Sequence, residues 1–256
     1  LMTIIDGIIL GIIQGITEFL PISSSGHLVL AQEFLGINQP GNKFEVLVHM
    51  GTLASIVVIF FSDIKTLLLS IRKNETQQFI YFIILGTIPA VLFGLGLKDT
   101  IDSFFDNIYV VGFALVFTGI ILFTSKFFKP VEKSISYRIS FMIGLAQALA
   151  IIPGISRSGM TISCALFLGL STKDSARFSF LLAIPVIFGA GLLMVFDIKN
   201  GLQIEVPVAV AGLLSSFIVG LLSLKWLLGL VESGKFHYFG LYCFCIGFLT
   251  IFYKWI

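Results

Sequence analysis

Apolar residues recur along the chain in long runs at helical spacing. A helix that crosses a membrane needs about 20 predominantly apolar residues, because it rises 1.5 Å per residue through about 30 Å of hydrocarbon. Six runs approach or exceed this length. The pattern therefore predicts an all-α, polytopic membrane protein with six transmembrane helices, over residues 45–62, 79–97, 108–128, 177–196, 207–228 and 238–256.

Four further helical stretches are unsuited to cross a membrane by themselves. Residues 3–20 end in Glu18 and Pro21, and residues 139–152 run into Pro153 and Gly154. The other two stretches, residues 27–37 and 160–170, are about eleven residues long, which is too short to cross a membrane. Two short helices joined by a Gly/Ser/Pro break suggest a re-entrant hairpin, since non-helical backbone at membrane depth must be buried in protein or line a wet cavity. The pattern predicts two such hairpins, from residues 3–20 with 27–37 and from residues 139–152 with 160–170.

An internal repeat relates the two hairpins. With a shift of 133 positions, GIIQGITEFLPISSSGHL at residues 11–28 aligns with GLAQALAIIPGISRSGMT at residues 144–161. Each half, approximately 3–128 and 139–256, then holds one hairpin and three spans within a single membrane domain. An odd number of spans inverts the second half, which gives an inverted-topology repeat with its site near the midplane. Identical pairs include Gly11 with Gly144, Gln14 with Gln147, Ser23 with Ser156, Ser25 with Ser158 and Gly26 with Gly159.

Composition and loop charge refine this topology. Only 12% of the residues are charged, against about 25% in soluble domains. The net charge of +2 leaves no basic surface for nucleic acid, so we expect no nucleic-acid partner. Lys and Arg gather in loops 63–78 and 126–138 but not in loops 98–107 and 197–206. Because basic residues accumulate on the cytoplasmic side, both termini are predicted to face outward.

Polar residues concentrate at the two hairpin tips, which the inverted repeat would bring together inside the membrane. An ionisable residue there is expensive and indicates function. An arginine fork, hydroxyls and free N–H groups at a helix start suit a phosphate. A hydroxyl or a histidine can attack, and a carboxylate can take a proton or hold a metal. The candidates are Glu18, Ser23, Ser24, Ser25 and His27 from the first tip and Ser156, Arg157, Ser158 and Thr161 from the second.

Other interpretations apply to several of these polar residues. Small-residue clusters in membrane helices also permit close packing, which is the alternative for the serines at the tips. His49, in FEVLVHMGTLAS, is interpreted as structural. Glu45 begins a span and either reaches an interface or faces the cavity. Gln14 lies on the same helix face as Glu18 and could orient a metal-bound water.

Two motifs carry a resemblance to a known family. The first runs from Gln14 to His27 and has the form Glu/Gln-x-x-x-Glu followed by Pro-x-Ser-Ser-x-Gly-His. The second, from Pro153 to Thr161, is Pro-Gly-x-Ser-Arg-Ser-x-x-Thr. With these motifs the chain closely resembles the undecaprenyl-diphosphate phosphatase family of bacteria, also called the bacitracin-resistance family, over essentially its whole length.

The resemblance implies an enzyme that removes the terminal phosphate of undecaprenyl diphosphate, a long-chain prenyl diphosphate lipid. That reaction regenerates the lipid carrier for cell-wall synthesis and confers bacitracin resistance. The resemblance further implies six spans with two re-entrant hairpins, a multi-pass location in the bacterial cytoplasmic membrane, an outward-facing site and a divalent cation, Mg or Ca. The sequence leaves open whether the protein is a monomer or a homodimer.

Roles carried over by position assign the site. Glu18 would be the essential carboxylate, Ser24 and His27 the nucleophile candidates beside water, and Arg157 the phosphate clamp. Gln14 stands where many members have glutamate, so Glu18 and Gln14 are the metal-ligand candidates, with substrate oxygens or a differently built site as alternatives. The expected phosphate-binding residues are Ser23, Ser25, Gly26, Ser156, Ser158 and Thr161.

A secondary transporter or lipid-carrier flippase is the alternative function. Inverted repeats with broken helices are a transporter architecture, and a fold does not determine a function. The chemistry at the tips separates the two. A transporter needs binding groups, but it has no need of Ser24 and His27 beside Glu18.

Overall fold

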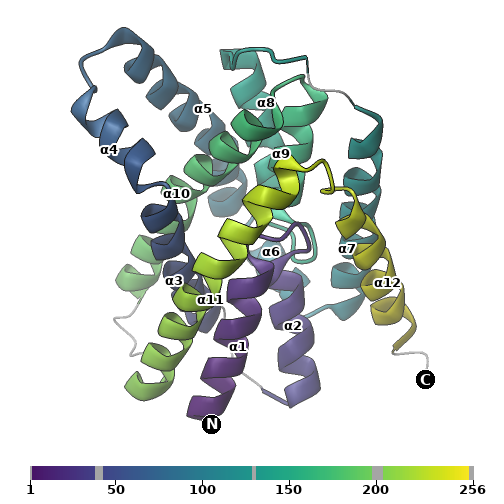
Figure 1. The fold of residues 1–256 in the computed structure, drawn as a ribbon. Coiled ribbons are helices and arrows are strands. Elements are labelled where there is room, and N and C mark those ends of the chain that lie inside the picture. Colours follow the sequence, from purple (N-terminus) through teal and green to yellow (C-terminus); the bar gives the residue numbers. More distant parts are fainter. Residues whose placement is uncertain (1, 38–42, 129–130, 198–203, 254–256) are drawn as a thin grey trace.

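The computed structural model describes residues 2–37, 43–128, 131–197 and 204–253, and every regular element within these ranges is helical. The all-α prediction is confirmed. The elements, labelled in Figure 1, are α1 (Ile4–Thr17), α2 (Ser24–Leu35), α3 (Lys43–Ile59), α4 (Phe61–Leu69), α5 (Asn74–Gly96), α6 (Lys98–Phe105), α7 (Ile108–Thr124), a 3-10 turn η1 (Ser125–Phe127), α8 (Tyr137–Leu149), α9 (Arg157–Phe167), α10 (Thr172–Asp197), α11 (Val206–Glu232) and α12 (Tyr238–Tyr253).

The long helices account for most of the predicted spans. In the described ranges, four helices are long and apolar enough to cross a membrane: α5, α7 with η1, α10 and α11. The polytopic membrane class is therefore confirmed. The predicted last span corresponds to α12, an apolar helix of 16 residues, and residues 254–256 of that prediction lie outside the described ranges.

The predicted first span, over residues 45–62, is divided. It becomes α3 and α4, which together could make a fifth span but are bent by 69°. Phe60 leaves helical geometry between them, and the bend carries Asp63 in the first turn of α4 to Arg177 on α10. The segment after α5, expected to be a loop, forms the eight-residue helix α6.

Both predicted hairpins are present. Helices α1 and α2 form the first and α8 and α9 the second, with non-helical tips at residues 18–23 and 150–156. Figure 1 shows the first hairpin rising from the end where α1 begins, and the second descending from the opposite end. The two tips meet in the interior of the molecule.

Glycine contacts repeat between the two halves. A Cβ atom on Gly11 of α1 would lie 2.5 Å from the carbonyl oxygen of Gly212 on α11. A Cβ atom on Gly144 of α8 would lie 2.5 Å from the carbonyl oxygen of Gly86 on α5. Gly11 and Gly144 are a repeat pair. The same position of each hairpin therefore packs against a long helix of the other half. These contacts support the predicted repeat, whose half boundaries at 3–128 and 139–256 stay a prediction.

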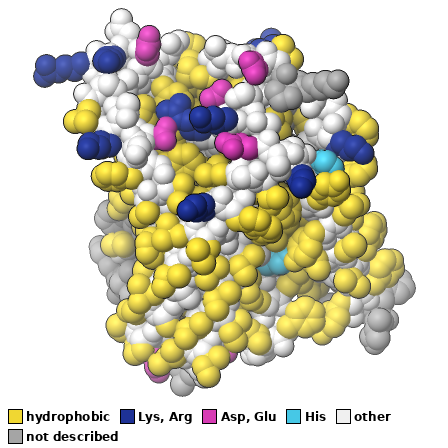
Figure 2. All heavy atoms as spheres, in the orientation of Figure 1, with side chains coloured by type: hydrophobic (Ala, Val, Ile, Leu, Met, Phe, Trp, Pro, Cys, Tyr) yellow, Lys and Arg dark blue, Asp and Glu magenta, His cyan; other side chains and the backbone are white. Residues whose placement is uncertain are grey.

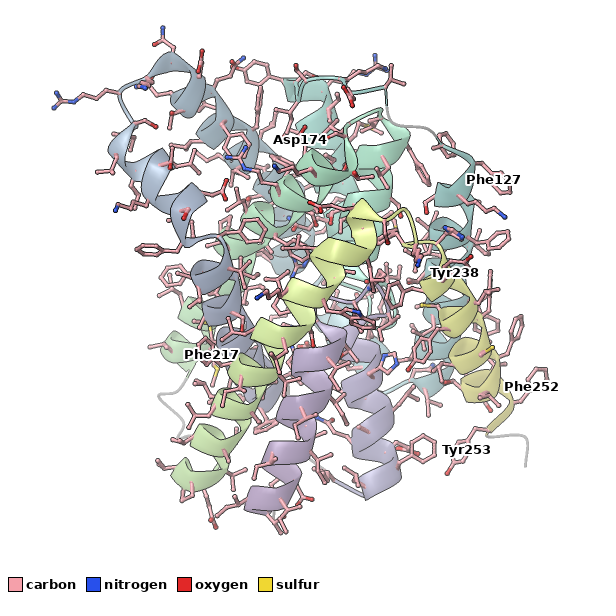
Figure 3. All side chains as sticks on the ribbon, in the orientation of Figure 1. Phe127, Asp174, Phe217, Tyr238, Phe252 and Tyr253 are labelled. Atoms are coloured by element: carbon pink, nitrogen blue, oxygen red, sulfur yellow. The ribbon has the colours of Figure 1, made fainter. Side chains whose placement is uncertain are left out.

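The outer surface is suited to lipid. Large apolar side chains are exposed along the long helices, among them Leu92, Phe113 and Leu222. Figure 2 shows hydrophobic side chains over the middle and lower parts of one face, while charged side chains gather toward the end that carries the α4–α5 connection. Phe252 and Tyr253 at the end of α12 point outward in Figure 3.

The positions of the two termini agree with the predicted topology, in which both lie on the same side of the membrane. Helix α1 begins and α12 ends toward the same end of the molecule (Figures 1 and 3). The assignment of that end to the outer side of the membrane depends on the loop charges and stays a prediction.

The glycine contacts generate a stability prediction. Gly144→Leu should prevent the close approach of α8 and α5, because overpacking a tight contact costs about 1–3 kcal/mol. We expect an apparent melting temperature several degrees below that of the unmodified protein, measured on detergent-solubilised samples.

Gly189→Leu is the matched control, since a Cβ atom at Gly189 on α10 would meet no atom within 4 Å in the described structure. This substitution should leave the melting temperature unchanged or raise it, because glycine weakens a helix. Equal melting temperatures for the two variants would contradict the proposed packing.

Candidate active site

A cavity of about 260 Å3 lies where the two hairpin tips meet. One side of it is polar and is formed by both tips together with α3 and α8. The other side is mainly apolar and is formed by α5, α6, α10, one residue of α3 and part of the second tip. The polar lining residues are Glu18, Ser23, Ser24, Ser25, Glu45, His49, Gln147, Ser156 and Arg157, and the apolar ones are Val46, Ala90, Phe105, Ala150, Ile151, Ile155, Val186, Ile187 and Ala190.

Glu18 is the centre of the polar side. Its Oε1 atom accepts a hydrogen bond of 2.6 Å from Nη2 of Arg157. Its Oε2 atom accepts from the hydroxyl of Ser24 at 2.6 Å and from Nε2 of Gln14 at 3.0 Å, and it lies 3.2 Å from Nε2 of His49. The carboxylate is almost fully buried, and a buried charge needs such partners. Glu18 therefore ties together α1, α2, α3 and α9.

Two equivalent helix starts face this cavity. Ser23 precedes α2, and its hydroxyl accepts from the backbone N–H of Gly26 at 3.3 Å. Ser156 precedes α9, and its hydroxyl accepts from the N–H of Gly159 at 3.1 Å. The first helical residues are then Ser24 in one tip and Arg157 in the other. Because N–H groups at a helix start favour anions, the repeat directs two anion-binding helix ends into one cavity.

The tips also bond directly to each other. The backbone N–H of Gly154 donates to the hydroxyl of Ser23 at 3.1 Å, and the hydroxyl of Ser158 donates to the carbonyl of Leu20 at 3.4 Å. Ser23 has a φ of 69°, which is unusual for a residue other than glycine. Its hydroxyl accepts two backbone N–H groups in this conformation, so the strained residue is held by both hairpins.

Some predicted phosphate-binding residues lie behind the cavity wall. Gly26, Ser158 and Thr161 do not line the cavity. The hydroxyl of Thr161 donates to the carbonyl of Arg157 at 2.8 Å and is 2.5 Å from the hydroxyl of Ser179. Ser158 and Thr161 therefore support the second tip in this structure, and direct contact with a phosphate stays a prediction for them.

His27 also lies away from the cavity. Its Nδ1 atom is 2.8 Å from the carbonyl of Ser23, so Nδ1 carries the proton and donates. Its Nε2 atom is 2.8 Å from the hydroxyl of Tyr242 on α12, and the two rings stack. A neutral His27 thus uses both ring nitrogens, which leaves neither one to attack phosphorus or to activate Ser24.

His49 takes the place beside Glu18 in which His27 was expected. Its Nδ1 atom donates to the carbonyl of Glu45 at 2.7 Å. Its Nε2 atom can therefore donate to Glu18 only when the ring is the imidazolium. The interpretation of His49 as a purely structural residue missed this contact. The available signal was a Glu and a His four residues apart in an apolar helix, which places both on one face.

The residues present can accommodate a divalent cation in part. Among the described residues, no group of three or more His, Cys, Asp and Glu side chains is arranged to hold a metal ion. However, the carboxylates of Glu18 and Glu45 line the same cavity, and the buried Oε1 atom of Gln14 has no partner in the described ranges. Mg²⁺ commonly binds to one or two carboxylates together with substrate phosphates. The donor set fits an ion that arrives with a phosphate ligand.

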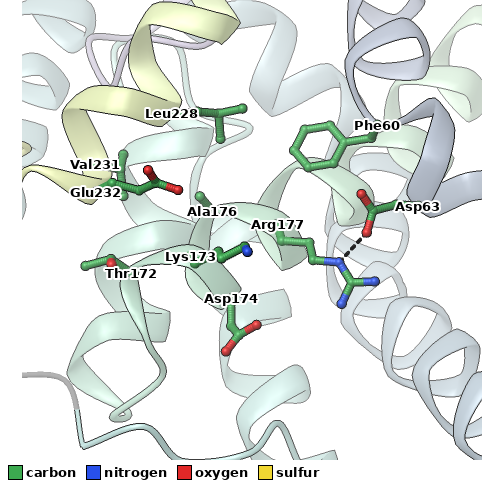
Figure 4. A pocket seen from close by; sticks show the side chains of 10 residues that line it. All are labelled: Phe60, Asp63, Thr172, Lys173, Asp174, Ala176, Arg177, Leu228, Val231 and Glu232. Atoms are coloured by element: carbon green, nitrogen blue, oxygen red, sulfur yellow. Dashed lines mark hydrogen bonds and ion pairs between the residues drawn. The ribbon is translucent and has the colours of Figure 1, made fainter.

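A larger cavity of about 510 Å3 lies elsewhere, near the start of α10 and the end of α11 (Figure 4). None of the predicted site residues lines it. Nε of Arg177 donates to Oδ1 of Asp63 at 2.5 Å, and the guanidinium also lies over the ring of Phe79. Three acidic and two basic side chains line this cavity, so it presents no excess of positive charge for a phosphate. The smaller cavity is the candidate active site.

The fold and this cavity together define a polytopic membrane protein in which two re-entrant hairpins enclose a buried, phosphate-suited site. The chain belongs to the family described as bacitracin resistance protein BacA, whose model matches residues 7–249. The resemblance found in the two motifs is confirmed over nearly the whole chain.

Curated relatives agree with this assignment. The chain is 40% identical to the undecaprenyl-diphosphatase of Syntrophotalea carbinolica and 41% identical to that of Desulfosudis oleivorans, in each case over 96% of this chain and 97% of the relative. It is 39% identical to undecaprenyl-diphosphatase 1 of Bacillus cereus, over 95% of each chain.

The geometry generates a prediction about Glu18. Glu18→Gln should leave the buried guanidinium of Arg157 without its counter-charge, which costs about 3–5 kcal/mol. We expect the melting temperature of the purified protein to fall by several degrees. In Glu18→Gln/Arg157→Gln the uncompensated charge is gone, so the double variant should recover part of the lost stability.

Glu18→Gln, Arg157→Gln, the double variant and the unmodified protein form a double-mutant cycle, which is measured by thermal unfolding in one detergent. Asp63→Asn/Arg177→Gln and the two corresponding single variants form the control cycle, because this more exposed pair lies in the other cavity. It should show a much smaller coupling. Additive effects of Glu18→Gln and Arg157→Gln on the melting temperature would show that Glu18 and Arg157 do not stabilise each other.

Proposed function

We propose that this protein hydrolyses undecaprenyl diphosphate to undecaprenyl phosphate and inorganic phosphate in the membrane. One observation carries the proposal: a serine hydroxyl lies 2.6 Å from a buried carboxylate, and an arginine is bonded to the same carboxylate. A transporter needs no such pair. The names of the relatives support the same reaction, and the family description supports a role in bacitracin resistance.

Ser24 is the proposed nucleophile and Glu18 its base. As the hydroxyl oxygen of Ser24 attacks the terminal phosphorus, its proton passes to Oε2 of Glu18. The bond from phosphorus to the bridging oxygen breaks, the proton on Glu18 passes to that oxygen, and undecaprenyl phosphate leaves. Water then attacks the phosphoserine, its proton passes to the serine oxygen by way of Glu18, and inorganic phosphate is released.

Arg157 is the proposed phosphate clamp. Its Nη2 atom is bonded to Glu18, whereas its buried Nη1 atom has no hydrogen-bond partner among the described residues. A phosphate oxygen would supply that partner. Charge builds on the phosphate oxygens during transfer, so a fixed guanidinium in a dry site would stabilise the transition state.

His27 is proposed to position Ser24 rather than to attack. Its bond to the carbonyl of Ser23 holds in place the residue that directly precedes α2 and Ser24. His49, beside Glu18, is the group that would share the proton taken from Ser24. The apolar wall, including Phe105, Ile151 and Ile187, suits the first isoprene units of the lipid.

A divalent cation would be held by Glu18 and Glu45, with Gln14 as a further oxygen donor, together with the diphosphate oxygens. When bound, such an ion neutralises phosphate charge and favours departure of the leaving phosphate. The protein is a multi-pass membrane protein. We propose the bacterial cytoplasmic membrane as its location and the outer side as the side to which the site opens, on the basis of the loop charges.

The nucleophile is tested by Ser24→Ala. We expect phosphate release from a long-chain prenyl diphosphate to fall by three or more orders of magnitude, since an activated nucleophile is lost. Ser233→Ala, at the exposed end of α11, serves as the matched control and should keep near-normal turnover. An acid-stable phosphoenzyme, trapped in the unmodified protein, should be absent from Ser24→Ala.

Two outcomes would overturn the assignment of Ser24. Substantial turnover by Ser24→Ala would favour direct attack by water. An acid-labile, base-stable phosphoenzyme would favour His27 and would require that its bonds to Ser23 and Tyr242 break during turnover.

The cation is tested by chelation. A chelator should reduce turnover to background, and Mg²⁺ or Ca²⁺ in excess should restore it. The melting temperature of the protein without substrate should not change on chelation, because the proposed ion needs the phosphate oxygens. Full activity in the presence of chelator would show that Arg157 and the helix ends stabilise the phosphate without a metal.

A further inference from the structure

Gln147 on α8 is a buried polar side chain that the proposed mechanism does not use. It lines the cavity, and only 2% of its surface is exposed. Neither its Nε2 nor its Oε1 atom has a hydrogen-bond partner in the described part of the chain. Burying an amide without a partner is unfavourable. The side chain is therefore placed as though a ligand completes its hydrogen bonds.

The repeat explains why no protein group fills this role. Gln14 is the repeat partner of Gln147, and its Nε2 atom donates to Glu18. The position that corresponds to Glu18 in the second half is Ile151, which has no polar side chain. Gln147 thus retains the donor of the first half without the carboxylate that accepts from it.

A second unpartnered donor lies in the same cavity wall. Arg157 also lines the cavity, and its buried Nη1 atom has no partner in the described structure, because only Nη2 is bonded to Glu18. Residues Ser156 and Arg157 place the start of α9 there as well. Two orphaned N–H donors beside a helix start are suited to an anionic oxygen.

We infer that Gln147 and Arg157 form a second phosphate subsite, which binds the phosphate that stays on the lipid. Ser24 then attacks the terminal phosphate, held between Glu18 and the start of α2. The inference rests on the proposed function and deepens it. A monophosphate lipid fills only the subsite of Gln147 and Arg157, whereas a diphosphate lipid fills both subsites and should bind more tightly.

The test is direct binding of two non-hydrolysable lipids, a prenyl methylene-diphosphonate and a prenyl monophosphonate of equal chain length. The unmodified protein should bind the diphosphonate at least about tenfold more tightly, as expected for hydrogen bonds to a charged group. Gln147→Leu should weaken binding of the diphosphonate and of the monophosphonate about tenfold each, because both lipids carry the phosphorus that binds there. In turnover, KM should rise more than kcat falls.

Two further variants make the test specific. Gln147→Glu adds a negative charge and should weaken diphosphonate binding more than Gln147→Leu does. Gln14→Leu, at the repeat-related position, should lower kcat through Glu18 and leave monophosphonate binding unchanged, in contrast to Gln147→Leu. Because Gln147→Leu removes an unpartnered amide, its melting temperature should equal or exceed that of the unmodified protein.

The outcomes distinguish the inference from the proposed function. If the unmodified protein releases phosphate and prefers the diphosphonate, but Gln147→Leu binds both lipids as tightly as the unmodified protein does, the subsite is wrong and the proposed function stands. If the unmodified protein neither binds the diphosphonate nor releases phosphate, the proposed function fails, and the inference fails with it.

Discussion

A single buried carboxylate organises the interior of this protein. Glu18 is buried in the interior, where an unpaired charge is expensive, and it is stabilised by Arg157, Ser24, Gln14 and His49. These partners come from both hairpins and from a long helix. Satisfying one charge therefore brings together a serine hydroxyl, a guanidinium and a histidine. The site is a consequence of that constraint as much as of the fold.

The repeat makes the two hairpin tips alike in backbone and capping. The charged and reactive side chains lie at positions where the two tips differ. The capping serines and the glycines behind them are equivalent in the two tips, and they give two matching helix starts. Among the repeat-related pairs that differ are Glu18 with Ile151, Ser24 with Arg157 and His27 with Met160. One tip thus holds the acid and the hydroxyl, and the other holds the positive charge. Such a division is what transfer of an anionic group requires.

Much of this arrangement could be predicted from the sequence. The broken apolar runs predicted both hairpins, and the shift of 133 positions predicted that their tips meet. Glu18, Ser24 and Arg157 were expected together, and the structure brings them into hydrogen-bonding contact. These predictions succeeded because they depend on local breaks and on a repeat, both of which are visible in one chain.

The histidines show what the sequence could not provide. His27 and His49 both donate from Nδ1 to the carbonyl four residues earlier. Their second nitrogens differ: Nε2 of His27 meets Tyr242, 215 positions away along the chain, whereas Nε2 of His49 meets Glu18. Proximity in a motif favoured His27, but long-range packing decides which ring faces the site. The bend between α3 and α4 likewise involves residues far apart in the sequence, because it brings Asp63 against Arg177.

The central claim is that both hairpin tips form one phosphate site around Glu18. The most direct measurement is an experimental structure of the protein with a bound long-chain prenyl methylene-diphosphonate. The account predicts the terminal phosphorus beside the Ser24 hydroxyl and phosphonate oxygens on Arg157, inside the smaller cavity. A headgroup bound in the cavity lined by Asp63 and Arg177, or one that contacts only a single hairpin tip, would contradict it.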